Sequence, residues 1–367
     1  MPTNPPTTDL DAAMMARALE LAARGEGRVE PNPMVGCVIT QQGEVVGEGW
    51  HQQHGGPHAE VNALAAAGDR AAGGTAYVTL EPCCHTGKTP PCTGALLTAG
   101  VARVVVAVRD PFPQVNGGGL QQLTDAGVVY EVGVGEADAR ALLAPYLKLI
   151  ERGRPWVIAK WAMTLDGKLA TSSGSSQWIS SPESRELVHR LRGRVDAVIV
   201  GAGTARDDDP LLTARPAGPR TAARIVLGEI PPASQLVKTA DQAPVISVVP
   251  APGAHHKVPP GVESLAVKGR THTERLAAVL DELGARRMTN VLIEGGARGL
   301  GAAFDGGLID EVHAFIAPKL CGGADAPSPI GGHGLADMTK ALRLTGVRIE
   351  TPGGDVYLRG RVEQGVS

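Results

Sequence analysis

The chain has few aromatic residues: Phe, Trp and Tyr together make up 3% of its 367 residues. Proteins that hold single-stranded nucleic acid stack bases on aromatic side chains, so this composition argues against such a surface. The formal net charge is only −3, which leaves no broad basic surface to attract nucleic acid or anionic lipid. We therefore expect a small-molecule partner, with neither nucleic acid nor a membrane involved.

Long apolar runs are scarce as well. No stretch is long enough to span a bilayer, and residues 1–6 lack the basic start and apolar centre of a signal peptide. The five cysteines are an odd number, and three of them, Cys83, Cys84 and Cys92, cluster instead of forming a disulfide framework. These features predict a reduced, cytoplasmic protein.

Glycine is abundant at 48 residues, and hydrophobic residues make up 43% of the chain. A chain of this length is expected to form two or three domains, each with its own core. The basic stretch over residues 148–154 suggests a boundary there. We expect a disordered tail over residues 1–8, a first domain over 9–149 and a second over 155–367.

Strands and helices are predicted to alternate in both domains, which indicates layered α/β folds with functional sites at strand ends. Thr8 and Asp11 would cap a helix whose apolar stripe is Leu10, Met14, Ala18 and Leu21. Further helices are expected over residues 58–67, 92–99 and 276–283, and a loop over 250–260. Strands are expected over residues 35–39, 45–48, 76–80, 104–108, 128–132, 156–161, 197–200, 224–227, 245–249, 291–293 and 312–317.

The most informative motif is His58-Ala59-Glu60, followed by Pro82-Cys83 and then Cys92. His-x-Glu followed by Pro-Cys and a second Cys is the signature of zinc-dependent base deaminases. A catalytic zinc takes three protein ligands and keeps a fourth position for water. His58, Cys83 and Cys92 are therefore predicted to bind zinc, and Glu60 to move protons as the catalytic acid and base.

The spacing of the two thiols departs from the usual Cys-x-x-Cys, because eight residues separate them. Those residues have loop composition, and Lys88 and Thr89 would project from the loop toward a phosphate or ribose. Cys92 would begin a helix, where the dipole favours a thiolate. Cys83 is preferred over Cys84 because it directly follows Pro82. The alternative is a set of unrelated thiols and a core histidine.

The second half contains two glycine-rich turns after predicted strands. The turn at residues 201–206 lacks the third glycine of a dinucleotide fingerprint, whereas Glu294-Gly295-Gly296 would let backbone N–H groups approach a phosphate. Either segment could be no more than a tight turn. Arg192 suits a phosphorylated substrate or is a solvated helix residue, and Lys160 is unusual in an apolar strand, where it could simply reach solvent.

Together these segments resemble the bifunctional riboflavin-biosynthesis deaminase–reductases of bacteria, over nearly the whole chain. The matching stretches are residues 31–37, 58–61, 79–83, 89–92, 165–168, 176–179, 208–213 and 294–296. The resemblance implies a cytidine-deaminase-like α/β/α domain followed by a dihydrofolate-reductase-like α/β domain. It implies zinc and NADPH as cofactors, and a homo-oligomer.

By the same resemblance, the first domain would remove the 2-amino group of a diaminopyrimidinone that carries a phosphoribosylamino arm. The second would use NADPH to reduce the ribosyl arm to ribityl. Asn32, His51, Lys88 and Thr89 would contact the substrate in the first domain. The NADPH contacts would be Ala162, Trp178, Thr204, Asp208, Gly296, Ala297, Arg298, Gly299, Leu300, Gly301 and Ala302. Ser176, Arg192, Leu212, Arg215 and Glu294 would hold the second substrate, with Lys160 and Glu294 assisting at the reacting carbon.

Three positions depart from the family pattern: Phe112 replaces an Asn, Cys84 a small residue, and Gly228 an Asp. Two other functions compete with the resemblance. A deaminase of nucleic-acid bases with a C-terminal binding module would need a basic, aromatic-rich surface, against which the composition argues. A protein whose second half binds nucleotide without reducing anything would show no NADPH oxidation dependent on the deaminated product.

Overall fold

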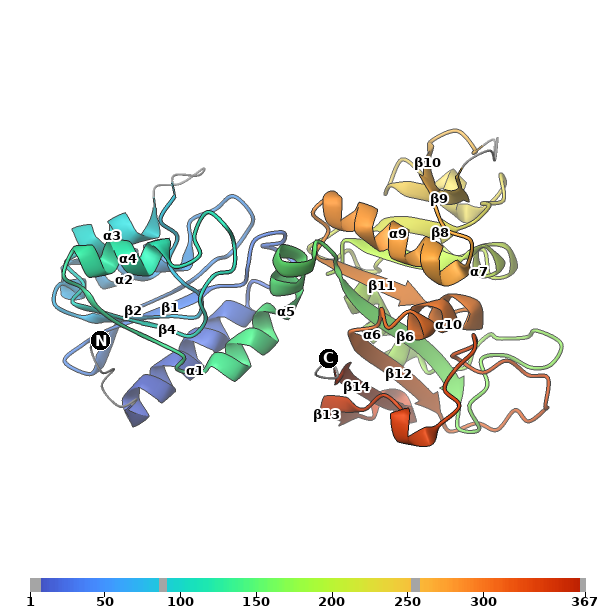
Figure 1. Ribbon diagram of the computed structural model, residues 1–367. Coiled ribbons are helices and arrows are strands. Elements are labelled where there is room, and N and C mark those ends of the chain that lie inside the picture. Colours follow the sequence, from blue (N-terminus) through green and yellow to red (C-terminus); the bar gives the residue numbers. More distant parts are fainter. Residues whose placement is uncertain (1–7, 86–90, 252–257, 364–367) are drawn as a thin grey trace. The chain divides into compact units, whose positions relative to one another are not determined.

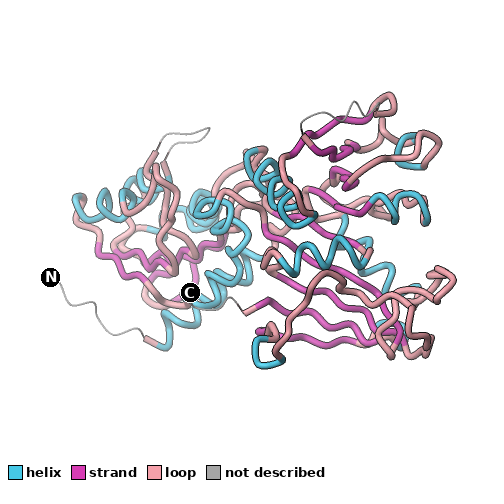
Figure 2. The backbone as a smooth tube through the Cα atoms, turned by 45° about the vertical axis from the view of Figure 1, so that its right-hand side comes forward, coloured by secondary structure: helices cyan, strands magenta, loops and turns pink. Residues whose placement is uncertain are grey.

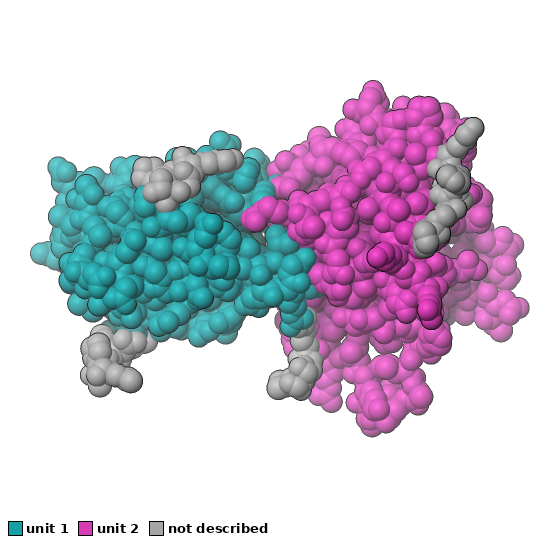
Figure 3. Space-filling view, turned by 45° about the horizontal axis from the view of Figure 1, so that its top comes forward, with its two compact units in different colours: residues 1–153 teal, residues 154–367 magenta. Residues whose placement is uncertain are grey.

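The structure is a computed structural model that describes residues 8–85, 91–251 and 258–363. The chain divides into two compact units, Met1–Gly153 and Arg154–Ser367 (Figure 3). Each unit has its own sheet and core and is described by itself. None of the described helices is both long and apolar enough to cross a membrane.

The first unit is built on a five-stranded sheet with the order β2-β1-β3-β4-β5. β1 pairs antiparallel with β2 and with β3, whereas β3, β4 and β5 are parallel. The parallel strands bring their carboxyl ends to one edge, where Cys83 follows β3. The strands are β1 (Gly36–Gln41), β2 (Glu44–Trp50), β3 (Thr75–Val78), β4 (Arg103–Val106) and β5 (Val129–Val132).

Helices cover both faces of this sheet (Figure 1). On one face, α1 (Asp9–Ala23) and α5 (Glu136–Arg152) enclose a core that includes Met15 and Leu143. On the other, α2 (Ala59–Ala67), α3 (Cys92–Thr98) and α4 (Gly118–Asp125) pack on alternate residues of the same strands. A 3-10 turn, η1 (Gly68–Ala71), follows α2. The predicted α/β/α layering is confirmed.

Thr8 and Asp11 form the predicted capping box at the start of α1. The predicted apolar stripe is partly wrong. Leu10, which it includes, is 40% exposed, whereas Met15, which it does not include, is fully buried. α4 and α5 were not predicted. The glycines that precede and open α4 and Pro145 inside α5 disfavour helix locally, and packing against the sheet outweighs this preference.

Glycine lets α2 approach the sheet closely. A Cβ on Gly49 of β2 would lie 2.3 Å from the backbone nitrogen of Ala63 and 2.5 Å from the carbonyl oxygen of Ala59. Only a residue without a side chain fits there. Since α2 carries His58 at its N-cap and Glu60 in its first turn, this contact sets the position of both.

The second unit contains a nine-stranded sheet with the order β10-β9-β8-β7-β11-β6-β12-β14-β13. Figure 2 shows its strands side by side. All neighbouring strands from the β10 edge of this order as far as β12 pair in parallel. β14 is antiparallel to both β12 and β13. The strands are β6 (Trp156–Thr164), β7 (Ala197–Gly201), β8 (Ala223–Leu227), β9 (Val245–Pro250), β10 (Val262–Val267), β11 (Asn290–Glu294), β12 (Glu311–Ala317), β13 (Leu344–Glu350) and β14 (Val356–Val362).

α9 (His272–Ala285) and α10 (Ala297–Asp305) cover one face and form the main core with alternate strand residues. The opposite face packs against α6 (Pro182–Arg192), where Val188 meets Phe315 and Tyr357. α6, β10, β13 and β14 were not predicted. Shorter elements are α7 (Ala202–Asp207), α8 (Gln235–Lys238), η2 (Met338–Lys340) and η3 (Pro352–Gly354).

Replacing Gly49 by Ala is expected to destabilise the first unit by about 1–3 kcal/mol, because the new methyl group meets backbone atoms of α2 that cannot move independently. Urea unfolding combined with hydrogen exchange of the α2 amides measures this. Gly94→Ala is the matched control, since a Cβ there meets no atom within 4 Å and alanine suits a helix. Equal stability of the two variants would contradict the argument.

Candidate active sites

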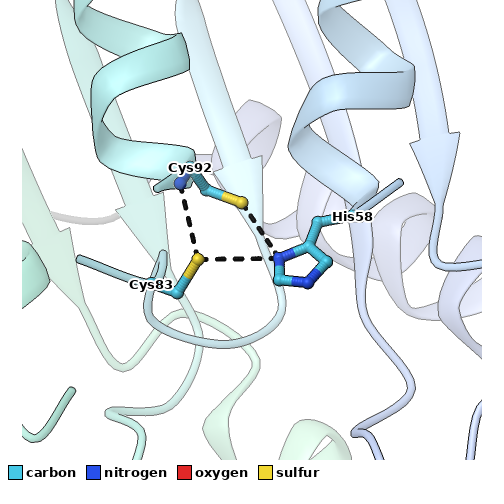
Figure 4. A group of neighbouring side chains, drawn as sticks. All are labelled: His58, Cys83 and Cys92. Carbon is cyan, nitrogen blue, oxygen red and sulfur yellow. Dashed lines mark hydrogen bonds between the residues drawn. The ribbon is translucent and has the colours of Figure 1, made fainter. Parts of the chain in front are cut away.

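Three element ends converge at the predicted metal site of the first unit (Figure 4). His58 is the N-cap of α2 and has extended backbone angles. Cys92 is the first residue of α3, after Pro91 at its N-cap. Cys83 lies in the extended segment beyond β3. The structure therefore brings together residues that are 25 and 9 positions apart, as the motif predicts.

The ligand atoms of His58, Cys83 and Cys92 all lie within 4.8 Å of one another. The Nδ1 atom of His58 is 3.1 Å from the Sγ of Cys92 and 3.6 Å from the Sγ of Cys83. The backbone N–H of Cys92 also donates to Cys83 Sγ at 3.4 Å. One imidazole and two thiols in this compact arrangement suit zinc, with one position left for water.

Hydrogen bonding shifts the pKa values of the two thiols in opposite directions. A hydrogen bond from the side chain of Cys92 lowers the pKa of the Cys83 thiol to about 4, and His58 and the backbone N–H of Cys92 contribute further. The same bond raises the pKa of Cys92. Cys83 is therefore a thiolate near neutral pH, which is the form that binds metal.

Cys84 points away from this cluster. Its Sγ donates to the carbonyl oxygen of Gln114 at 3.5 Å, while the neighbouring peptide of Cys83 is fixed by Thr93. Both the backbone N–H and the hydroxyl of Thr93 donate to the Cys83 carbonyl, at 3.2 and 3.3 Å. The geometry supports the choice of Cys83.

Glu60 lies in the first turn of α2 and is 3% exposed. Burial raises the pKa of its carboxyl group to about 7, and the nearby Cys83 adds to the rise. A carboxyl group with a pKa near the working pH can both accept and return a proton.

Asn32 and His51 lie next to each other near His58. The ring of His51 is buried, and its centroid is 5.5 Å from that of His58. Its Nδ1 lies 3.0 Å from the Pro57 carbonyl oxygen, and its Nε2 lies 3.3 Å from the Asn32 amide nitrogen. Because the carbonyl can only accept, Nδ1 carries the proton and Nε2 accepts from Asn32. Burial lowers the pKa of His51, which favours this neutral form. Lys88 and Thr89 lie outside the described residues.

Glu81 is a positioning residue to which the sequence analysis gave no role. Its carboxylate is 3% exposed and accepts four backbone N–H bonds, at 3.0 to 3.3 Å, two of them from the first turn of α4. The residue therefore ties the segment that carries Cys83 to the loop after β4. The feature of the sequence that could have indicated this role is a carboxylate two residues before a predicted metal ligand. The four donors are distant in sequence: Asp110, Gly117, Gly119 and Leu120.

In the second unit, Arg192 and Glu294 form a bidentate ion pair with N–O distances of 2.6 and 2.7 Å. Their side chains are only 14% and 8% exposed, so the solvated alternative for Arg192 is wrong. Burial opposes the charge on Glu294, yet its pKa is lowered because Arg192 and Lys160 favour the carboxylate.

Lys160 lies inside β6, which continues to Thr164, and the residue is partly exposed. It pairs across the sheet with Glu294 of β11 and His313 of β12, and its Nζ lies 5.7 Å from the centre of the Phe315 ring. Burial lowers the pKa of its ammonium group, and Arg192 adds to the effect.

Further cationic groups surround this ion pair. Burial lowers the pKa of Arg215, and Arg192 contributes. The Nδ1 of His189 lies 3.2 Å from the carbonyl oxygen of Thr213. Burial lowers the pKa of His189, and the charges of Arg192 and Arg215 lower it further. Leu212 is buried with a positive φ of 56°. The cluster has more cationic than acidic groups, which suits a phosphorylated ligand.

A pocket of about 700 Å³ lies at the carboxyl ends of β7, β8, β9 and β11. Six of the predicted NADPH contacts line it: Thr204, Gly296, Ala297, Arg298, Gly299 and Ala302. Leu300 and Gly301 do not, because the side chain of Leu300 is in the core and Gly301 packs against the backbone of Gly331.

The remaining predicted contacts lie outside the lining of this pocket. Trp178 is 64% exposed, and the guanidinium of Arg185 stacks over its ring at 4.6 Å. The hydroxyl of Ser176 donates to Asp208 at 3.4 Å. Ala162 packs beside Phe315 on the α6 face.

Comparisons with known proteins match a family model to each unit. The family model of the cytidine and deoxycytidylate deaminase zinc-binding region matches residues 8–108. The family model of the RibD C-terminal domain matches residues 155–358. Riboflavin biosynthesis protein RibD of Actinobacillus pleuropneumoniae is 39% identical over 98% of this chain and 97% of its own. That of Synechocystis is 42% identical over 97% and 99%.

Solved structures match over the full chain as well. Acinetobacter baumannii RibD, form 1, has a TM-score of 0.83 and 35% identity over 97% of this chain and 99% of its own. A Thermotoga maritima diaminohydroxyphosphoribosylaminopyrimidine deaminase/5-amino-6-(5-phosphoribosylamino)uracil reductase has a TM-score of 0.83 and 33% identity over 96% and 99%.

A zinc-binding deaminase unit followed by a reductase unit of the NADPH-dependent type defines a bifunctional enzyme. The chain belongs to the RibD family of riboflavin biosynthesis proteins. The predicted family, fold class and pair of activities are thereby confirmed.

Replacing Cys83 by Ser is expected to remove bound zinc, because a neutral hydroxyl is a much weaker ligand than a thiolate. Elemental analysis of the purified full chain measures the zinc content. Cys84→Ser is the matched control and should keep one zinc per chain, since that thiol faces Gln114. Zinc loss in the Cys84 variant alone would reverse the assignment.

Proposed function

We propose that the first unit, residues 9–149, acts on 2,5-diamino-6-(5-phosphoribosylamino)pyrimidin-4(3H)-one. It hydrolyses the 2-amino group and gives 5-amino-6-(5-phosphoribosylamino)uracil and ammonia. The observation that carries this proposal is the cluster of His58, Cys83 and Cys92 beside the buried Glu60. The similar protein from Thermotoga maritima is a diaminohydroxyphosphoribosylaminopyrimidine deaminase, which supports the choice of substrate.

His58, Cys83 and Cys92 would hold the zinc, which lowers the pKa of a bound water and so supplies a nucleophile near neutral pH. Glu60 would carry two protons in turn: one from the attacking water to the ring nitrogen, and then one from the hydroxyl added to the ring carbon to the leaving amine. Asn32, fixed by the neutral ring of His51, orients the base through its amide. Lys88 and Thr89 are proposed to contact the ribose phosphate.

We further propose that the second unit, residues 155–367, reduces the ribosyl arm of this product with NADPH, giving 5-amino-6-(5-phosphoribitylamino)uracil. The observation that carries this proposal is the largely buried cluster of Lys160, Arg192 and Glu294. Glu294 ends β11, two residues before Gly296, which lines the pocket. Ser176, Leu212 and Arg215 complete the substrate contacts.

NADPH supplies a hydride, which suits a ring-opened imine at C1 of the ribose. Reduction of that imine also requires one proton at nitrogen. Lys160 would donate it, and burial makes its ammonium group a stronger acid. Glu294 orients the substrate while Arg192 keeps its carboxylate ionised.

The proposal includes a cytoplasmic location and an assembly of identical subunits. The described cysteines are all free, which suits a reducing compartment. Family membership supports the assembly, and apolar side chains of the edge strand β13, Val347 and Ile349, are exposed. Light scattering of the purified chain tests the assembly.

A two-stage assay tests both activities on the full chain. Ammonia release is followed first, with the diaminopyrimidinone alone, and NADPH oxidation is followed after the deaminated product has formed. NADPH oxidation without that product, or none with it, would contradict the second activity. Ammonia release from single-stranded DNA or RNA instead would point to a nucleic-acid deaminase.

Replacing Glu60 by Gln is expected to slow ammonia release by roughly 10²- to 10⁴-fold, because the amide cannot carry a proton. Zinc content should not change, since Glu60 is not a ligand. Glu44→Gln, at an exposed position of β2, is the control. Unchanged turnover in the Glu60 variant would exclude the proposed role.

Replacing Lys160 by Ala is expected to slow reduction by roughly 10²-fold or more while ammonia release stays at the wild-type rate. Single-turnover oxidation of NADPH measures this step. Lys268→Ala is the control for removing an exposed lysine from the same unit. Equal reduction rates in the Lys160 variant and the wild type would remove this residue from the mechanism.

A further inference from the structure

The pocket of the second unit has two ends with different chemistry. One end is lined by Thr204 and by Gly296, Ala297 and Gly299 at the start of α10. The other end is lined by residues at the ends of β8 and β9 and by His272 and Arg275 at the start of α9. Because the strand order is β11-β7-β8-β9, three strand spacings of ~4.8 Å separate the ends, about 14 Å in total.

The glycine end fits the diphosphate of a dinucleotide. Gly296 has a φ of 76°, and a Cβ on it would lie 3.3 Å from the hydroxyl oxygen of Thr204, so a side chain would fill the space in front of α10. The first N–H groups of a helix have no partner within it and favour an anion. An adenosine half extending from here along the sheet edge would reach His272 and Arg275.

Two arginines that line the pocket, Arg206 and Arg275, differ in whether a carboxylate already neutralises them. Arg206 is neutralised by a bidentate pair with Asp207, at 2.8 and 3.2 Å. Arg275 has no carboxylate within 4 Å anywhere in the described parts of the chain, and its Nη2 lies 3.3 Å from Nδ1 of His272. Since arginine only donates, that Nδ1 accepts, and the ring N–H is on Nε2. Both side chains therefore offer donors.

We propose that Arg275 and His272 bind the 2′-phosphate of NADPH and so select it over NADH. This inference rests on the proposed reductase function. Arg298, in the first turn of α10, belongs to the glycine end of the same pocket. Glu229 also lines the pocket, and a carboxylate beside the adenosine ribose would favour the unphosphorylated hydroxyl. The guanidinium of Arg275, with the Nε2–H of His272 beside it, is what offsets this preference.

The test compares binding of 2′,5′-ADP and 5′-AMP to the full chain by calorimetry, because the two ligands differ only in the 2′-phosphate. Arg275→Ala should weaken 2′,5′-ADP binding by roughly 10- to 100-fold and 5′-AMP binding by less than about twofold. Arg206→Ala, the matched control, should change neither by more than about threefold. Arg275→Lys should restore part of the loss, since it keeps the charge without the fork.

Steady-state kinetics give the second readout. Arg275→Ala should raise KM for NADPH and leave KM for NADH unchanged. Equal weakening of 2′,5′-ADP and 5′-AMP, or a larger effect of Arg206→Ala, would overturn the inference. Ammonia release at the wild-type rate checks that the variant chain is folded. If wild-type protein binds 2′,5′-ADP but oxidises no NADPH, the proposed function fails and the assignment of the phosphate site stands.

Discussion

The convergence of one imidazole and two thiols within 4.8 Å is the constraint on which the first unit depends. Each donor sits at the end of a different element, so two helices and a strand must meet at one point. Gly49 allows α2 to lie against the sheet, Thr93 fixes the peptide that carries Cys83, and Glu81 ties the same segment to the loop after β4. The fold is thus arranged around the positions of three side chains.

In the second unit, charged side chains lie in a largely buried position and are stabilised by ion pairing. Arg192 and Glu294 neutralise each other, and Lys160 lies beside them on the α6 face. The glycine turn directly after Glu294 opens toward the pocket below α10. The carboxyl edge of one sheet therefore carries both the cluster proposed to hold the substrate and the pocket proposed to hold the cofactor.

Local sequence was sufficient for some elements and not for others. Strands β6 to β9, β11 and β12 could be predicted from the sequence because apolar residues run through them, as expected for a parallel sheet covered on both faces. α4, with glycines at its start, and α5, with Pro145, were missed because tertiary packing outweighs their local preferences. The four donors to Glu81 could not be predicted, since they come from residues 29 to 39 positions away.

The sequence alone identified the three side chains of the candidate metal site, the adjacent glutamate proposed to carry protons, and the two-part architecture, because these follow from residue type and order. Only the tertiary structure decided that Cys83 faces His58 while Cys84 turns to Gln114, that Arg192 is paired and buried, and that Arg275 meets the same pocket as Gly296. Those outcomes depend on the directions of side chains and on the order of strands, which neighbouring residues in the sequence do not specify.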